Sequence, residues 1–178
     1  MNPILLFIQK IATPKGFAIL FALYVVVFGA ILLTLAQLTA HTGGIGILDF
    51  DRGYTAERVA EVFGSYGKQG MALYTRIQLL DLLNPALYSL FFAAIIHLLW
   101  RNHSAIAAWI VLFPFWAGLL DYAENVTLFL LTRSYPKLST ELVRLSSTLS
   151  IIKNFALIPA IIVLLIGLVL FAMHRFKR

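Results

Sequence analysis

The sequence contains no cysteine among its 178 residues. This absence excludes disulfide bonds, thiolate metal sites, thiol nucleophiles and Cys-x-x-Cys redox chemistry together. The sequence also lacks HExxH, GxSxG, P-loop and dinucleotide-binding motifs, so it does not predict a conventional hydrolase, NTPase or dinucleotide enzyme. A di-metal site in a helical bundle would need Glu-x-x-His pairs, which are missing too. We therefore expect neither a cofactor nor a bound metal.

Charged residues are also scarce. They make up 12% of the chain, whereas 61% of the residues are hydrophobic and the mean hydropathy is +0.89. Soluble domains contain about 25% charged and about 45–50% apolar residues. Such an excess of apolar residues cannot be buried in one soluble core of this size, and several runs approach the roughly 20 residues that span a bilayer. The composition predicts a single membrane domain over residues 1–178.

The net charge of +6 does not indicate nucleic-acid binding in this context. The basic residues are scattered singly or stand at helix ends, where lysine and arginine anchor to lipid headgroups. No basic face or nucleic-acid recognition motif is visible. We expect membrane lipids as partners and no nucleic acid, and the sequence leaves a homo- or hetero-oligomer open.

The apolar runs predict an all-α fold, a polytopic membrane protein built as an antiparallel four-transmembrane-helix bundle. The expected spans cover about residues 17–40, 71–100, 105–132 and 142–173. The turn at 101–104 is so short that the helices on either side must run antiparallel as neighbours. The apolar piece Pro3–Ile11 is expected to lie along the membrane surface.

The loop at 41–70 combines turn residues with one amphipathic segment. Val59, Val62, Phe63 and Tyr66 recur at spacings of three and four, and Thr55 precedes them as an N-cap. This pattern predicts a short helix on the membrane surface. The nearby DxD pair, Asp49 and Asp51, is interpreted as a solvated turn in preference to a weak cation site.

The distribution of basic residues predicts the orientation. Six lie on the side of the two termini and six on the other side. The first group stands in short tails and a tight turn, whereas several of the second group stand in the long loop. Basic residues in long loops influence membrane orientation less than those in short segments. We expect both termini in the cytoplasm and the membrane to be a bacterial inner membrane, with both longer loops extracytoplasmic.

Each expected span carries a polar side chain at nearly the same depth. An α-helix rises about 1.5 Å per residue, so Asp81, Glu124 and Lys153 lie roughly 30 Å above their cytoplasmic ends. Gln37 lies roughly 33 Å from Lys15 by the same reasoning. All four helices should therefore contribute to one polar layer in the outer half of the bilayer, below the outer headgroups.

Helical spacing selects the residues of this layer. Groups three or four residues apart share a helix face, and lipid cannot hydrogen-bond them, so these faces should turn toward each other. The expected ligand-binding residues are Gln37, Arg76, Gln78, Asp81, Asn84, Tyr88, Asp121, Tyr122, Glu124, Asn125, Ser150, Lys153 and Asn154.

The charges of the layer do not balance. Asp81, Asp121 and Glu124 face the two cations Lys153 and Arg76. Burying an uncompensated carboxylate is costly, so we expect one of the three carboxyls to be protonated at pH 7. Pro85 frees a backbone carbonyl one turn earlier, near Asp81, and a kink there would widen the space beside that carboxyl.

Three functions fit these residues. The first is binding of a lipid-like or small amphipathic ligand. The second is an intramembrane acid–base enzyme, such as an isomerase or a lipid-modifying enzyme, with Asp121 or Glu124 as acid–base and Asp81 as partner. The third is an accessory subunit of a membrane complex, in which Lys153 pairs with an acid of the third span and Arg76 pairs with Asp81 for structural reasons alone. A pocket beside Asp81, Glu124 and Lys153 would favour the first two.

Overall fold

The computed structural model describes residues 3–51, 53–100 and 108–176. Of these described residues 87% are helical, and none lies in a strand. The helices are α1 (Pro3–Ile11), α2 (Pro14–His41), α3 (Ala56–Asp81), α4 (Asn84–Trp100), α6 (Phe113–Ser134) and α7 (Thr140–Phe176), with the 3-10 turn η1 (Leu48–Phe50) between α2 and α3.

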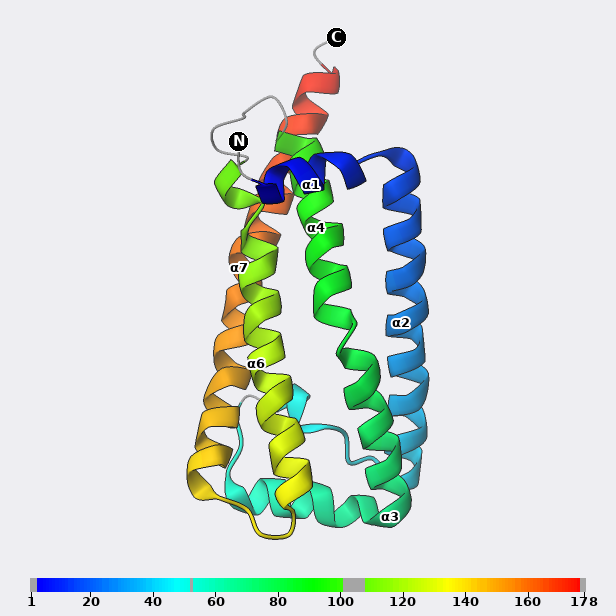
Figure 1. Ribbon diagram of the computed structural model, residues 1–178, viewed down its shortest axis with the longest axis vertical. Helices are drawn as coiled ribbons and strands as arrows, with labels where there is room; N and C mark the ends of the chain where they lie inside the picture. Colours follow the sequence, from blue (N-terminus) through cyan, green and yellow to red (C-terminus); the bar gives the residue numbers. More distant parts are fainter. Residues whose placement is uncertain (1–2, 52, 101–107, 177–178) are drawn as a thin grey trace.

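The long helices stand side by side as an elongated bundle (Figure 1). α7 packs against α6 and α4, and α2 packs against α3 and α4. α1 lies across one end of the bundle, the same end at which α7 finishes, and the first part of α3 lies across the opposite end (Figure 1). α2 and α7 are thus on opposite sides of the α4 helix.

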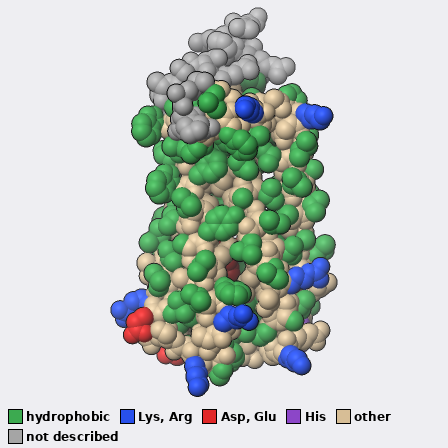
Figure 2. Space-filling view, viewed as in Figure 1, with side chains coloured by type: hydrophobic (Ala, Val, Ile, Leu, Met, Phe, Trp, Pro, Cys, Tyr) green, Lys and Arg blue, Asp and Glu red, His purple; other side chains and the backbone are tan. Residues whose placement is uncertain are grey.

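Three segments are long and apolar enough to cross a membrane: Pro14–His41, Ala56–Trp100 and Thr140–Met173. Most large apolar side chains of α2 and α7 are exposed on the outside of the bundle. In Figure 2 hydrophobic side chains cover the middle of the molecule, and lysine and arginine gather toward its two ends. These features are compatible with a membrane protein. α6 is not among the three segments, and it carries Asp121, Glu124 and Asn125 in its middle.

The predicted span 71–100 is interrupted. α3 ends at Asp81 and α4 begins at Asn84, directly before Pro85. Proline has no backbone N–H to donate to the carbonyl four residues earlier, so the backbone hydrogen bonding of the helix is interrupted in the turn before Pro85. The Tyr122 hydroxyl donates a hydrogen bond of 2.9 Å to the backbone carbonyl of Leu82 at this break. The kink that Pro85 predicted is confirmed, and it stands beside Asp81.

The other spans differ from the prediction at their ends. α2 and α7 extend two to three residues beyond the predicted starts at 17 and 142. The turn at 101–104 and the start of the third span lie outside the described residues. Within the described part, a helical turn at 108–110 precedes α6, which begins at Phe113 with Pro114 in its first turn.

The predicted amphipathic helix forms the first part of α3. The Thr55 side chain accepts a hydrogen bond of 3.3 Å from the backbone N–H of Arg58, so the predicted N-cap is confirmed. The expectation that the apolar stripe contacts the membrane is wrong. Val59, Val62, Phe63 and Tyr66 are at most 1% exposed and pack inside the protein with Leu38, Tyr74 and Leu131. An apolar stripe is removed from water equally well by the protein core and by the membrane. The sequence pattern therefore could not distinguish a helix packed in the core from a helix on the membrane surface.

Gly67 redirects the chain between the two parts of α3. Its φ of 54° and ψ of −164° are non-helical, and a positive φ is costly for residues with a Cβ. Before Gly67 the helix runs across the end of the bundle, and after it the chain rises alongside α2 (Figure 1). This turn directs Tyr74, Gln78 and Asp81 into the bundle.

Candidate functional site

Lys153 of α7 is the centre of a buried charge cluster. Its Nζ atom lies 2.9 Å from Oδ1 of Asp121 and forms an ion pair with Oε2 of Glu124, both on α6. The three side chains are 14%, 10% and 0% exposed, in that order. Asp121 and Glu124 are three residues apart and thus share one helix face. The sequence spacing of α6 and α7 therefore brings these groups together as expected.

The long loop supplies a third carboxylate. Oδ1 of Asp49, in η1, lies 3.8 Å from Nζ of Lys153, and its side chain is 18% exposed. Burial raises the pKa of Asp49 to about 6, and the Lys153 ammonium opposes that rise. The interpretation of Asp49 as part of a solvated turn is wrong, because η1 is folded against the bundle. Asp51 instead accepts a hydrogen bond of 2.8 Å from Nε of Arg58.

Asp81 is held by two side-chain amides, and no cation of the described residues pairs with it. The Nδ2 groups of Asn84 and Asn125 donate hydrogen bonds of 3.0 Å and 2.7 Å to its two carboxylate oxygens. The expected pair of Asp81 with Arg76 is not formed, because Arg76 is exposed on the other side of α3. No ion pair involves Asp81 or Arg76 within residues 3–51, 53–100 and 108–176.

Hydroxyl groups connect the cluster to its surroundings. The Tyr88 hydroxyl donates a hydrogen bond of 3.2 Å to Oδ2 of Asp121. Thr127 of α6 donates a hydrogen bond of 2.8 Å to Oγ of Ser146, which also lies 2.7 Å from the Tyr54 hydroxyl. Ser146 and Ser150 are fully buried on the face of α7 that carries Lys153. These bonds fix α6, α7 and the loop before α3 against each other around the charges.

A cavity of about 330 Å³ lies beside the cluster. Its polar lining residues come from η1, α3, α4, α6 and α7, whereas α2 contributes apolar residues alone to the described lining. The polar residues are Asp49, Tyr74, Gln78, Asp81, Asn84, Tyr88, Asp121, Asn125, Lys153 and Asn154. The apolar residues on α2 are Phe28, Ile31, Leu32 and Leu35. A recessed acidic patch is visible between hydrophobic side chains in Figure 2.

Several polar atoms of the cavity residues have no hydrogen-bond partner in the described part of the chain. They are the Tyr74 hydroxyl, Oε1 of Gln78 and Oδ1 of Asn84. Tyr74 is only 1% exposed. Buried polar groups in proteins are nearly always hydrogen-bonded, so these atoms need hydrogen-bond partners beyond the described residues.

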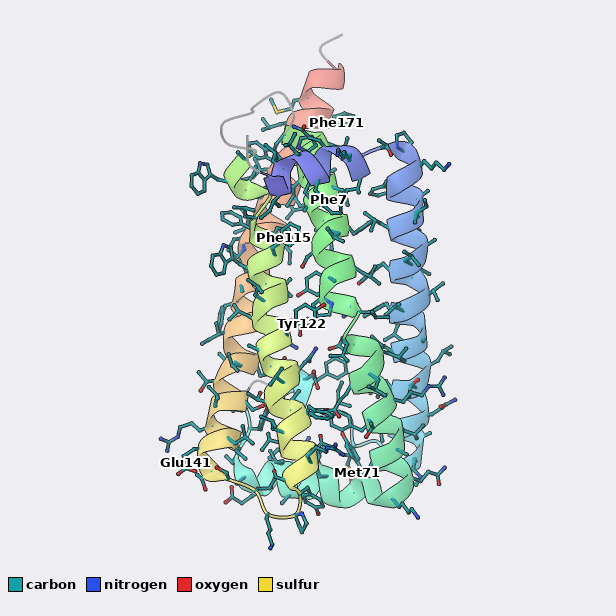
Figure 3. The ribbon with its side chains drawn as sticks, in the orientation of Figure 1. Phe7, Met71, Phe115, Tyr122, Glu141 and Phe171 are labelled. Atoms are coloured by element: carbon teal, nitrogen blue, oxygen red, sulfur yellow. The ribbon has the colours of Figure 1, made fainter. Side chains whose placement is uncertain are left out.

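Five of the expected site residues do not line this cavity. Gln37 and Arg76 are exposed, and the α2 residues that line the cavity are all apolar. Tyr122, between the two ends of the bundle in Figure 3, uses its hydroxyl for the Leu82 carbonyl. Glu124 is completely buried behind Lys153. Ser150 is buried as well and belongs to the surrounding hydroxyl network.

The sequence did not indicate Asp49, Tyr54 or Thr127 as members of the site. Asp49 and Tyr54 lie in the loop before α3, where no helical period relates them to the bundle. The available signal was the DxD spacing within an otherwise apolar chain. Among the described residues no group of three or more histidine or acidic side chains is arranged to hold a metal ion.

The fold and the site describe a helical bundle with many apolar side chains exposed on α2 and α7 and a cavity lined by both polar and apolar residues. Comparisons of the chain with protein-family models, with curated proteins and with solved structures give no match.

Proposed function

We propose that this chain is a membrane protein that binds a lipid-like or small amphipathic molecule in its internal cavity. The observation that carries the proposal is the cavity of about 330 Å³ itself, with charged and amide groups opposite the apolar residues of α2. Ligand pockets have volumes of about 300–1,000 Å³ and combine apolar walls with a few convergent polar groups. An amphipathic molecule can satisfy both walls at once.

In this proposal α2, the second part of α3 with α4, α6 and α7 form four membrane spans. α6 carries too many polar groups to face lipid on all sides, but its charged face packs against α7 and the cavity, which leaves Trp116, Leu119 and Val126 exposed outside. Intramembrane charges are tolerated when they face the bundle interior. We place the termini in the cytoplasm of a bacterial cell and the cavity in the outer half of the inner membrane, on the basis of the basic residues in the short tails.

The acid–base enzyme is the second candidate. Asp121 and Glu124 both bind Lys153, and Glu124 does not line the cavity. Asp81 is the carboxyl that faces the cavity without a cation among the described residues, so the catalytic alternative depends on Asp81. A purely structural role for the polar layer would favour tight pairing without a cavity.

Substitutions that fill the cavity should remove the bound molecule. Leu35 lines the apolar wall, whereas Leu33 on the same helix is 70% exposed on the outside. We expect wild-type protein and Leu33→Trp to retain a co-purified small molecule in native mass spectrometry after mild extraction. Leu35→Trp should lose it, because the indole occupies the cavity.

Leu157→Trp, which approaches the same cavity from α7, provides a second test in case Leu35→Trp does not fold. Equal retention by Leu33→Trp and the cavity variants would contradict the proposal. Absence of any specific small molecule from the wild-type protein would contradict it too.

A further inference from the structure

The cavity carries an excess of negative charge. Asp49, Asp81 and Asp121 line it, with Glu124 directly behind, and Lys153 is the one basic residue among its described lining residues. Four carboxylates against one ammonium give a net charge of −3 if all five groups are ionised. Lys153 already contacts three of the four carboxylates. Asp81 is therefore the carboxylate without a cationic partner in the described structure.

The unpartnered atoms of the cavity are mainly acceptors. Gln78 donates through Nε2 to Oγ1 of Thr132, which itself donates to the Leu128 carbonyl, so Oε1 of Gln78 is the free atom. Asn84 must turn its amide nitrogen to the Asp81 carboxylate, which leaves its Oδ1 free. The fully buried Tyr74 hydroxyl can donate or accept. Because oxygen acceptors are in excess, the missing partner is a donor.

We propose that the ligand is a single-chain amphiphile with a primary ammonium headgroup bound at Asp81, an inference that rests on the binding function proposed above. A primary ammonium carries one positive charge and three N–H donors and accepts no hydrogen bond. It therefore matches both the charge of Asp81 and the free oxygens of Gln78 and Asn84. The alkyl chain packs against the apolar wall formed by Ile31, Leu35 and their neighbours on α2.

Headgroups of the opposite charge do not fit this cavity. A phosphate or carboxylate would need a free cation, but Lys153 is already bound by Asp49, Asp121 and Glu124. Burying an unpaired anion beside further carboxylates is strongly unfavourable. The volume of about 330 Å³ is at the lower end for ligand pockets, so it suits a headgroup with part of one chain better than a two-chain phospholipid.

Four probes with the same dodecyl chain test the headgroup: dodecylamine, dodecyltrimethylammonium, 1-dodecanol and dodecanoic acid. Binding to the full-length protein in phosphatidylcholine nanodiscs is measured at pH 7 by native mass spectrometry and thermal shift. We expect dodecylamine to bind about 10- to 100-fold more tightly than 1-dodecanol, the range for a hydrogen bond to a charged group. The quaternary amine, which has no N–H donor, should bind more weakly than dodecylamine, and the acid most weakly.

The Asp81→Asn variant should lose this preference for dodecylamine. Asp51→Asn is the matched control, because Asp51 pairs with Arg58 and does not line the cavity. If Asp81→Asn does not fold, Gln78→Met removes another acceptor of the same cavity and should weaken the binding of dodecylamine, with its three N–H donors, more than that of 1-dodecanol, with its single O–H donor.

The outcomes separate this inference from the proposed function. If all four probes bind equally and Leu35→Trp blocks them all, the binding function stands and the ammonium assignment is overturned. If none binds, both fail. Stabilisation by Na⁺ or Mg²⁺ alone that depends on Asp81 would identify an inorganic cation site and overturn the inference. Equal competition by phosphatidylethanolamine would overturn the single-chain assignment.

Discussion

Replacing Lys153 by methionine is expected to lower the free energy of unfolding by about 3–5 kcal/mol, the range for removal of one partner from a buried ion pair. Lys153 is 14% exposed and contacts Asp121 and Glu124, and the variant leaves both carboxylates without their cation. Methionine keeps a similar length and an apolar stem, so the loss reports mainly the charge. Denaturant unfolding in a neutral detergent measures it.

Lys137→Met is the matched control, because Lys137 is exposed in the loop between α6 and α7. Its unfolding free energy should stay within about 0.5 kcal/mol of wild type. Adding Asp121→Asn and Glu124→Gln to Lys153→Met should recover part of the loss, because the buried charges are then removed together. A stability of Lys153→Met equal to that of Lys137→Met would show that the cluster is hydrated and not a buried ion pair.

Replacing Phe63 by alanine is expected to destabilise the protein by about 3–5 kcal/mol, the range for truncating a buried aromatic residue. Phe63 is 1% exposed, and its ring centre lies within 6 Å of those of Tyr66, Tyr74 and Tyr135. The alanine leaves a cavity where the first part of α3 packs on the end of the bundle. The same unfolding experiment measures the effect.

Phe155→Ala is the control for this substitution, because Phe155 is 67% exposed on the outside of α7. It should change the unfolding free energy by less than about 0.5 kcal/mol. If Phe63→Ala proved as mild as Phe155→Ala, the segment before Gly67 would have to lie on the membrane and not on the protein.

Helical periodicity predicted much of the bundle and part of the candidate site. The i, i+3 and i, i+4 spacings on α6 and α7 correctly grouped Asp121, Glu124 and Lys153, because side chains so spaced share one helix face. The kink near Asp81 followed from Pro85, since proline lacks the N–H that the ladder needs. These features depend on local geometry that the sequence specifies directly.

Depth along a helix does not give direction around it, which explains two errors. The prediction for Gln37 used its depth alone, but α2 buries Ile31, Thr34 and Leu38 and leaves Gln37 exposed. Arg76 is two residues from Gln78, so the two side chains are about 200° apart around the helix and cannot face the same cavity. The predicted ion pair of Arg76 with Asp81 is therefore not formed.

The role of Asp49 depends on tertiary packing that no local pattern encodes. η1 has no period to align with the helices, and its position is set by contacts of Ile47 and Leu48 in the core. The burial of the first part of α3 is similar, because an apolar stripe fits a membrane surface and a protein core equally well. Both features could be found only once the helices were assembled.

Photolabelling tests most directly whether the internal cavity holds the amphiphile. A dodecyl compound with a photoreactive group on its chain is added to the protein in nanodiscs, and labelled peptides are mapped by mass spectrometry. The account predicts labelling at Leu35, Leu128 and Leu157, which line the cavity, and its suppression by excess dodecylamine. Labelling confined to Leu33 and Phe155 on the outside of the bundle, unaffected by the competitor, would contradict it.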